Sequence, residues 1–544
     1  MRNPQTFNFK VLSVTLLLTT VSITPWFSYD SINLPKFTAL VVGGSFLLFG
    51  LIDYKRMVIF KKLRVIILSV LFFLFWSIIT YLKSDMNKLE GFYGVDGRRT
   101  GLVTYLFLSV IFLSALFISG EKQNKTYFKI LLISGTLSAV YALIQILKLD
   151  PFLWNTQYKP IFGFFGNSNF LSSFLGISSC AIMSPALIGN FSRSMKYFLR
   201  SYLAIVLCII YYTESEQGFF VFLTGLTITS FAIIKNSDRY KKYSSTFLFS
   251  TVIAIFIVLM DILQKTPWKS FLYSPSISER GEFWRAAIKL TTDNPFFGVG
   301  LDGFQDSYHR YRESGAAIRD PNAQVNSVHN VILDFSVGGG IPLALCYVFI
   351  CGLVIRSGIK VLRKSTSNDV YFISIFSAWV GYQVQSIISI NQIGIAIWGW
   401  ILGGAIIGYE KTYDNNFLTL PTSRVKKKTI LNIFALCLGL ALAIPQIIVD
   451  TNFRSQIRTG DGNLLLESID NFPTSIDRIN IIGSLFLENN LPIQALVVSK
   501  YGIENYPNNL QAWKIYYGNP NLSTLERKKA EARIRILDPL NKKF

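Results

Sequence analysis

The chain has 544 residues, of which 51% are hydrophobic and only 16% are charged, and its mean hydropathy is +0.39. These values exclude an ordinary soluble protein of this length. The formal net charge is +21, but much of the positive charge falls in short segments between apolar runs, where membrane topology already accounts for it. No contiguous basic domain offers a nucleic-acid footprint. We therefore expect a polytopic membrane protein that binds no nucleic acid.

Apolar runs recur along most of the chain, and each is long enough to cross a hydrocarbon core of about 30 Å as a helix. We count about thirteen such runs. They cover residues 11–28, 36–53, 64–82, 101–119, 128–147, 168–189, 197–213, 216–235, 246–263, 329–356, 369–388, 391–409 and 429–449. The first run lacks a small-residue cleavage site, so we expect a retained helix. The predicted fold class is all-α, a transmembrane helical bundle.

Every second connection between these runs is rich in Lys and Arg, which predicts that it lies in the cytoplasm. The basic connections are residues 54–64, 122–129, 193–200, 235–242, 356–364 and 411–428. With the N-terminus inside, this alternation predicts four parts. They are an N-terminal bundle (1–263), a large extracytoplasmic loop (264–328), C-terminal transmembrane helices (329–449) and an extracytoplasmic tail (450–544).

The tail has a soluble composition and a repeated aromatic or acidic residue before proline. Phe472-Pro473, Tyr506-Pro507 and Asp538-Pro539 follow one another at roughly 34 and 32 residues, a spacing typical of helical-hairpin repeats. Residues 475–488 and 492–504 are both amphipathic. We predict a tetratricopeptide-like tail, with a short helical cap as the alternative. About two repeats are few for independent stability, so we expect the tail to dock on the membrane part or on a protein partner.

The most informative segment is the charged and aromatic insert from Glu279 to Asn330, which holds both histidines of the chain, His309 and His329. A solvated loop of this kind can bind an anion and move a proton. His329 stands where a helix enters the membrane from the outer face, which suits a general base. The alternative is a helix-start histidine bonded to a loop carbonyl. For His309 we favour a surface role.

Two arginines of the insert, Arg280 and Arg285, have the guanidinium geometry that clamps a diphosphate. Alternatively, they pair with Glu279 and Glu282. Asp334 lies about one turn beyond His329, so a pair between them is possible but imperfect. The outer loops contain no carboxylate pair spaced as a metal box, and the five cysteines show no zinc spacing. We expect no metal and no other cofactor.

Three further outer segments carry candidate ligands. Residues 94–99 contain Arg98 and Arg99, and residues 162–169 contain Asn167 and Asn169, which either cap the following helix or contact a ligand. The third segment, residues 213–218, includes Glu214, Glu216 and Gln217 at a turn between two spans. The simplest interpretation of this third segment is a solvated turn.

Several motifs occur in order over about a hundred residues. They are Arg280-xxx-Trp284-Arg285-Ala286-Ala287, Asn294-Pro295-Phe296-Phe297-Gly298-Val299-Gly300, Ser327-Val328-His329-Asn330 and Gly338-Gly339-Gly340-Ile341-Pro342, with Arg99-Thr100-Gly101 and Gly166-Asn167-Ser168-Asn169 upstream. This pattern resembles the O-antigen ligase and polymerase superfamily. Members with extracytoplasmic tetratricopeptide tails match the architecture predicted above.

The resemblance implies a metal-independent, membrane-embedded glycosyltransferase of the GT-C type, which transfers a glycan from a polyprenyl diphosphate to an acceptor outside the cytoplasm. It implies that Arg280 lies near the diphosphate and that His329 activates the acceptor hydroxyl. The remaining candidates for substrate binding are Arg285, Arg98, Arg99, Asn167, Asn169, Gln217 and Asn330.

One departure from the family pattern concerns the turn before residue 218. The family often has Ser-Arg-Gly where this chain has Ser215-Glu216-Gln217-Gly218. Either Arg98, Arg99 or Arg285 replaces the absent arginine, or this branch uses a different donor.

We therefore expect a ligase of the bacterial cytoplasmic membrane whose acceptor is a lipid, a glycan or a protein. A polysaccharide polymerase and a protein O-oligosaccharyltransferase are alternatives in the same family. A transporter of lipid-linked glycans is the alternative of another class, although the inverted repeats common in transporters are not visible. A scaffold that acts through its tail alone is a third hypothesis.

Overall fold

The computed structural model describes residues 4–52, 57–152, 154, 161–262, 264–265, 275–364, 369–413 and 428–541. Within these ranges the regular structure is helical and no strand occurs. The fold class predicted from the sequence, all-α, is thus confirmed for the described residues. Most of the basic segment 411–428 lies outside them.

The long helices occupy the predicted apolar runs. They are α1 (Pro4–Val21), α2 (Asn33–Ile52), α3 (Met57–Lys83), α5 (Leu102–Phe117), α6 (Glu121–Ile146), α7 (Ser168–Ile188), α8 (Arg193–Tyr212), α9 (Glu216–Asn236), α10 (Ser244–Ile262), α14 (Val331–Lys364), α15 (Val370–Ile388), α16 (Ile393–Tyr413) and α17 (Lys428–Thr459). Ten helices in the described part of the chain are long and apolar enough to cross a membrane. Helices α1 and α5 are apolar but shorter, and α15 is not among the ten, so a total of thirteen spans stays a prediction.

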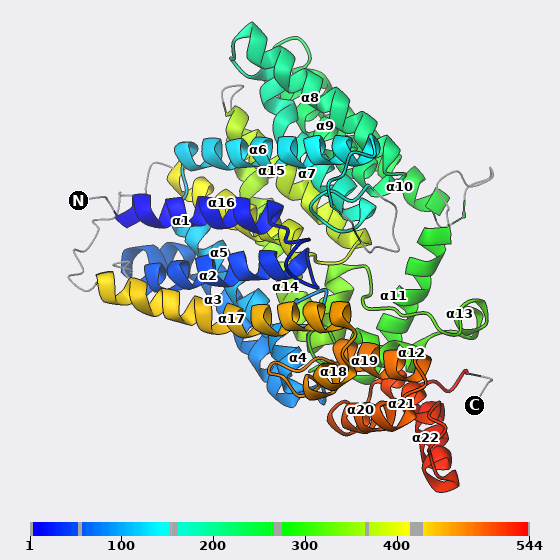
Figure 1. Ribbon diagram of the computed structural model, residues 1–544. Helices are drawn as coiled ribbons and strands as arrows, with labels where there is room; N and C mark the ends of the chain where they lie inside the picture. The colour runs from blue at the N-terminus through cyan, green and yellow to red at the C-terminus, as the bar shows by residue number, and fades with distance from the viewer. Residues whose placement is uncertain are drawn as a thin grey trace.

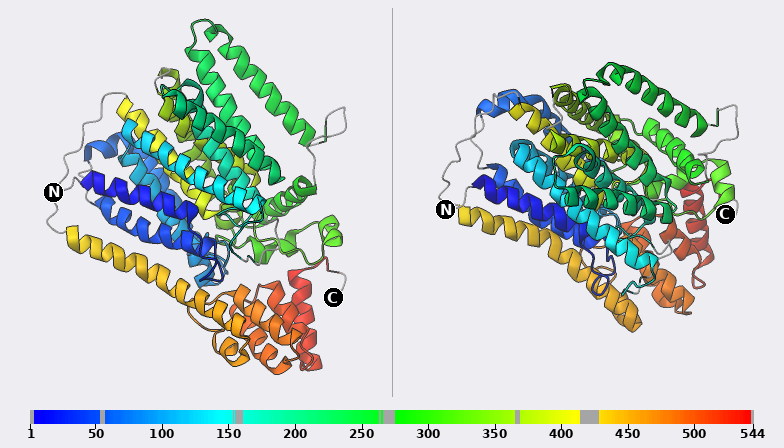
Figure 2. Two further views of the ribbon diagram at one scale, coloured as in Figure 1. Left: turned by 45° about the horizontal axis from the view of Figure 1, so that its top comes forward. Right: turned by 90° about the horizontal axis from the view of Figure 1, so that it is seen from above.

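The remaining α-helices gather at one end of the bundle, opposite the N-terminus (Figures 1 and 2). They are α11 (Pro275–Asp293), α12 (Phe304–Tyr311), α13 (Ser314–Arg319), α18 (Gly462–Glu467), α19 (Ile476–Glu488), α20 (Pro492–Asn505), α21 (Leu510–Tyr517) and α22 (Thr524–Leu537), with α4 (Lys88–Tyr93) after α3. We call this end of the molecule the tail end. Both the charged insert and the C-terminal tail lie there.

Close helix packing in the middle of the bundle depends on small residues. Helix α16 lies against α5 through Gly404 and Gly408, one turn apart. A Cβ at Gly404 would lie 2.1 Å from the carbonyl oxygen of Phe112, and one at Gly408 would lie 2.4 Å from that of Leu116. Because lipid tails are as apolar as Leu, helices in a membrane associate mainly by such close van der Waals contact. These glycines therefore fix α16 in the centre.

Helix α14 is broken inside its apolar stretch, at Gly340, where φ is +71°. Pro342 follows two residues later and has no backbone N–H, so it cannot donate to the carbonyl of Gly338. Glycine adopts a positive φ without the steric cost that a Cβ imposes. The Gly-Gly-Gly-Ile-Pro motif thus produces a helix break at a defined place.

Backbone groups freed by this break find partners in the charged insert. The carbonyl oxygens of Val337 and Gly338 accept hydrogen bonds from the N–H groups of Val299, at 2.8 Å, and Gly300, at 3.1 Å. Irregular backbone at membrane depth is tolerated only where protein or a water-filled cavity covers it. The Asn-Pro-Phe-Phe-Gly-Val-Gly motif therefore provides the cover for the break in α14.

The charged insert is more ordered than the solvated loop we expected. Its helices α11 and α12, together with the start of α14, enclose a small apolar core that includes Ala287, Leu290, Phe304 and Val328. Alternation of apolar and charged residues at helical spacing in residues 279–293 explains why α11 can bury one face. The insert is a folded unit that holds its charged side chains in place.

The tail forms two helix pairs, α19 with α20 and α21 with α22, and docks on the membrane part. The backbone N–H of Ile476 donates to Glu90 at 3.1 Å, and Asn509 donates to Asp306 at 2.9 Å. Arg478 pairs with Asp96 at 3.2 Å. The helix pairs agree with a repeat architecture, whereas the tetratricopeptide-like character stays a prediction.

Candidate functional site

His329 occupies a fixed position in the turn before α14. Its φ is +57°, a conformation uncommon for a residue with a side chain. The backbone N–H of His329 donates to Ser327 Oγ at 3.2 Å. Asp334 accepts hydrogen bonds from Ser327 Oγ at 2.9 Å and from the N–H of Val328 at 3.1 Å. Asp334 therefore stabilises the turn that carries His329 by bonding Ser327 and Val328, the two residues just before the histidine.

The ring of His329 packs on α11. It stacks on Phe283 with 5.8 Å between ring centroids and an interplanar angle of 30°. Phe283 in turn meets Tyr308 of α12 edge to face, at 5.6 Å. Thr291 and Ser336 join α11 to α14 through hydroxyl groups 3.0 Å apart. The sequence analysis missed Phe283, although its position three residues after Arg280 on a helix places both on one face.

The electrostatic surroundings keep His329 uncharged. Burial lowers the pKa of the imidazole to about 3, and the positive charges of Arg280 and Arg98 contribute in the same direction. An ordinary histidine has a pKa near 6.5. His329 is thus a neutral imidazole at physiological pH, able to accept a proton or a hydrogen bond.

Arg280 is the cation of α11 on the His329 side. Burial lowers the pKa of its guanidinium, opposed by the carboxylates of Glu216 and Glu279. Glu216 belongs to the first turn of α9, so the tertiary structure brings the N-terminus of α9 within electrostatic range of Arg280. From the sequence we expected Glu216 to lie in a solvated turn.

Arg98 lies between two carboxylates beneath this turn. Its guanidinium is 3.3 Å from Asp302 and 3.8 Å from Asp334, and it also donates to the backbone carbonyl of Asn326. Burial opposes the charge, but Asp302 and Asp334 outweigh it, so the pKa of Arg98 is raised. Arg98 therefore ties the α4–α5 connection to the turn that carries His329.

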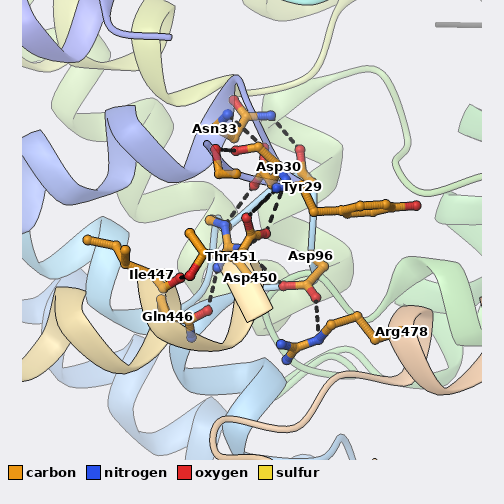
Figure 3. Close-up of polar contacts among 12 residues, drawn as sticks. Tyr29, Asp30, Asn33, Asp96, Gln446, Ile447, Asp450, Thr451 and Arg478 are labelled. Atoms are coloured by element: carbon orange, nitrogen blue, oxygen red, sulfur yellow. Dashed lines mark hydrogen bonds and ion pairs between the residues drawn. The ribbon is translucent and has the colours of Figure 1, made fainter. Parts of the chain in front are cut away.

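Arg99 points into a different cluster, which lies against the second half of α17. It donates to Asp30 at 2.8 Å and to Gln446 at 2.5 Å, and it lies 3.3 Å from Asp96 and 3.7 Å from Asp450. Figure 3 shows Asp30, Asp450 and Gln446 close together in this cluster. Arg99 is 1% exposed. These contacts give Arg99 the geometry of a structural cross-link.

The remaining candidates lie in several places. Arg285 is half-exposed and pairs with Glu313 at 2.9 Å, and Glu282 pairs with Arg319, so Arg285 and Glu282 each have a partner outside α11. Asn330 caps α14, accepting from the N–H groups of Ile332 and Leu333 at 3.0 and 3.1 Å.

Two of the three amide candidates near α7 and α9 are engaged locally. Asn167 caps α7 by accepting from the N–H of Asn169 at 2.8 Å. Gln217 is buried and accepts from Ser173 Oγ at 3.1 Å. The positions of these side chains explain how the helix ends are built.

His309, the second histidine, faces the tail instead of His329. Its Nδ1 is 3.6 Å from Asp538. Burial and then Arg312 lower the pKa of His309 to about 4, although Asp538 acts in the opposite direction. His309 thus lies partly buried at the contact between α12 and the tail, whereas from the sequence we favoured a surface role. Among the described residues, no group of three or more His, Cys, Asp or Glu side chains is placed to hold a metal ion, and metal independence stays a prediction.

These features define a multi-pass membrane protein with a folded charged insert that carries a neutral histidine beside an arginine. A family model described as O-antigen ligase matches residues 201–348, a range that contains Gln217, Arg280 and His329. The match confirms the resemblance to the O-antigen ligase superfamily over these residues. A search of the curated proteins finds no match to the chain.

Proposed function

We propose that the protein is a membrane glycosyltransferase that moves a glycan from a polyprenyl diphosphate carrier to an acceptor hydroxyl outside the cytoplasm. The observation that carries this proposal is the neutral imidazole of His329 within the electrostatic field of Arg280. A base beside a cation suits the attack of a hydroxyl on a sugar diphosphate. The O-antigen ligase match over residues 201–348 supports the same chemistry.

In the proposed reaction, the acceptor oxygen forms a bond to the anomeric carbon of the transferred sugar. The bond between that carbon and the diphosphate oxygen breaks, and the leaving diphosphate keeps the electron pair. His329 takes the proton of the acceptor hydroxyl, and Arg280 offsets the charge of the leaving group. The balance of this step needs no metal and no further reactant.

Donor binding activates His329 in this proposal. A pKa near 3 makes a weak base, because a general base works best when its pKa lies near the operating pH. Part of the low pKa comes from the positive charges of Arg280 and Arg98. A diphosphate bound at Arg280 supplies negative charge that offsets this field and raises the pKa of His329.

Arg280 is the principal diphosphate ligand in this scheme. The charge of Arg280 acts on His329, the proposed base. Arg98 is buried against Asp302, Arg99 is buried against Asp30, and Arg285 pairs with Glu313. Because the proposed transfer takes place outside the cytoplasm, the tail end of the bundle is the extracytoplasmic end in this scheme. The membrane is the bacterial cytoplasmic membrane.

A transfer assay with purified full-length protein tests the proposal. The donor is lipid-linked glycan extracted from cells that lack this protein, and EDTA is present throughout. Lipid, glycan and peptide acceptors are supplied separately. Wild type is compared with His329→Ala and Arg280→Ala, and the matched controls are His309→Ala and Arg458→Ala, the latter an exposed arginine on α17.

Transfer by wild type and by both controls, with at least about 100-fold lower turnover in the two site variants, supports the assignment. Equal turnover in wild type and His329→Ala would exclude His329 as the base. Absence of transfer to every acceptor, together with movement of the lipid-linked glycan across proteoliposome membranes, would instead favour a transporter.

A further inference from the structure

A cavity of about 460 Å³ lies at the tail end, outside the site described above. Its walls come mainly from four segments of the chain. They are the α3–α4 connection with Lys83 and Asn87, the segment from Asn294 to Val299, helix α12 with Asp306 and Arg310, and the α20–α21 connection from Asn505 to Asn508. Its volume falls within the range of about 300–1,000 Å³ that is common for small-molecule sites.

Helix α12 separates this cavity from His329. One face of α12 presents Phe304 and Tyr308 to the apolar core next to Phe283. The other face presents Asp306 and Arg310 to the cavity. The cavity contains neither His329 nor Arg280 in its lining, so it is a separate site.

Hydrogen bonds and a ring contact hold the wall segments in place. Asn509 donates to Asp306 at 2.9 Å, and Asn87 donates to the carbonyl of Asn505 at 3.4 Å. Trp76 of α3 donates to the carbonyl of Phe296 at 3.2 Å and stacks on Phe297, with ring centroids 5.6 Å apart. The tail and the insert therefore form a preorganised cavity at the end of α3.

Its lining combines amides with aromatic rings. Asn87, Asn294, Asn505 and Asn508 each make at least one hydrogen bond within the protein. Because a side-chain amide has two N–H donors and two acceptor lone pairs, each keeps capacity for a ligand. Phe296, Phe297, Tyr311 and Tyr506 offer flat apolar faces, and Phe296 and Phe297 are 64% and 39% exposed. Paired donors and acceptors match sugar hydroxyl groups, and aromatic faces match the C–H faces of sugar rings.

Charge and backbone geometry argue against other ligands. Two cationic side chains, Lys83 and Arg310, are balanced by two carboxylates, Asp85 and Asp306, so no excess of positive charge selects a phosphate. The part of the chain that the structure describes contains no strand, so it offers no sheet edge to which an extended peptide could add as a further strand.

We propose that this cavity binds a saccharide chain, independently of the catalytic step at His329. The inference rests on the proposed function for the identity of the glycan, and it adds a second carbohydrate site built jointly by the tail and the insert. The ligand is an uncharged stretch of glycan that lies at the outer end of α3, where the last residue of this span, Lys83, meets the cavity.

Saturation-transfer NMR tests the proposal on full-length protein in a sugar-free amphiphile, because maltoside detergents would themselves occupy such a site. The probe is the oligosaccharide released by mild acid from the lipid-linked glycan of the same cells. Isomaltoheptaose, inorganic phosphate and a serine-rich peptide serve as comparison ligands. The variants are Phe297→Ala and Arg310→Gln, with Phe27→Ala and Arg458→Gln as exposed controls outside the cavity.

We expect the released oligosaccharide to bind wild type, both controls and His329→Ala alike, and to bind each cavity variant about five- to tenfold more weakly. Thermal unfolding midpoints equal to wild type establish that the variants are folded, and Arg310 is exposed, so its replacement disturbs little packing. Absence of binding to wild type, equal binding to the cavity variants, or preference for phosphate or peptide would each overturn the proposal. Loss of binding in His329→Ala would place the saccharide at the catalytic site instead.

Discussion

The imidazole of His329 stacks on the ring of Phe283, with centroids 5.8 Å apart and planes inclined by 30°. The first residue belongs to the turn before α14 and the second to α11, so the contact fixes the distance between the proposed base and the helix of Arg280. Val328 joins the turn to the apolar core of α11, and Asp334 holds the turn through hydrogen bonds.

Replacement of Phe283 by Ala should leave His329 free to rotate and lower kcat by about 10- to 100-fold, because small misplacement of a reacting group is costly. The KM for the donor should change little, since Arg280 remains. Phe283→Tyr keeps the ring and serves as the control. Steady-state kinetics of transfer measure kcat and the KM for the donor in each variant. A rise in KM without a fall in kcat would contradict a positioning role for Phe283.

The ionisation of His329 can be measured through diethyl pyrocarbonate, which modifies neutral imidazole only. With a pKa of about 3, His329 should react equally fast at pH 5 and pH 7, whereas an ordinary histidine with a pKa near 6.5 slows by about 20-fold. In Arg280→Gln the loss of a nearby positive charge should raise the pKa, but burial is the largest cause of the low value, so the two rates should stay nearly equal. Peptide mass mapping separates His329 from His309, and a midpoint near pH 6.5 in wild type would refute the low pKa.

The break in α14 predicts contrasting effects for two glycines of that helix. A Cβ at Gly340 would lie 2.2 Å from the carbonyl oxygen of Phe296, and its φ is +71°, whereas a Cβ at Gly352 meets nothing within 4 Å. Gly340→Ala should destabilise the protein by more than about 2 kcal/mol. Gly352→Ala should be neutral or stabilise it by up to about 1 kcal/mol. Unfolding midpoints of the purified variants test both, and equal midpoints would argue against a strained break.

The buried ion pair between Arg312 and Asp538 should hold the end of the tail on α12. The two hydrogen bonds from Arg312 measure 2.8 and 2.9 Å, and both side chains are fully buried. Asp538→Asn leaves the arginine without its charge partner, which should cost about 3–5 kcal/mol. The matched control is Glu531→Gln, which removes the exposed pair with Arg535 and should cost less than about 1 kcal/mol. Limited proteolysis of the tail reports the difference.

The tail contact should depend on pH through Asp477 at the start of α19. Burial, followed by the carboxylates of Asp96 and Asp306, raises the pKa of Asp477 to about 7. A hydrogen bond from Gln305 and the charge of Arg478 oppose this rise. An unfolded aspartate has a pKa of about 3.9, so the folded state binds the proton more tightly. The resulting stabilisation is complete below about pH 4 and is lost as the pH rises through 7.

Hydrogen exchange of α19 should therefore be slower at pH 5.5 than at pH 8 after correction for the intrinsic rate. Asp477→Asn should abolish most of that difference, and Glu488→Gln at the exposed end of the same helix should preserve it. The same pH dependence in Asp477→Asn would show that another group controls docking.

The sequence by itself determined where the helices lie, because an apolar run of sufficient length must satisfy its own backbone hydrogen bonds in lipid. It also pointed to His329 as the candidate base, since only two histidines occur in the chain and one of them precedes an apolar run. The glycines and the proline of residues 338–342 marked a special backbone segment, although the helical break itself was not predicted.

Only the tertiary structure decided which charges meet. Arg98 and Arg99 are neighbours in the chain, yet one pairs with Asp302 and the other with Asp30 and Asp450. Glu216 came within range of Arg280, and Phe283 came into contact with His329, through tertiary packing. The cavity at the tail end likewise draws its walls from segments far apart in the sequence. Local periodicity reports the burial of a helix face, whereas the partner of a buried charge depends on the packing of the whole chain, because each such charge requires compensation wherever the fold places it.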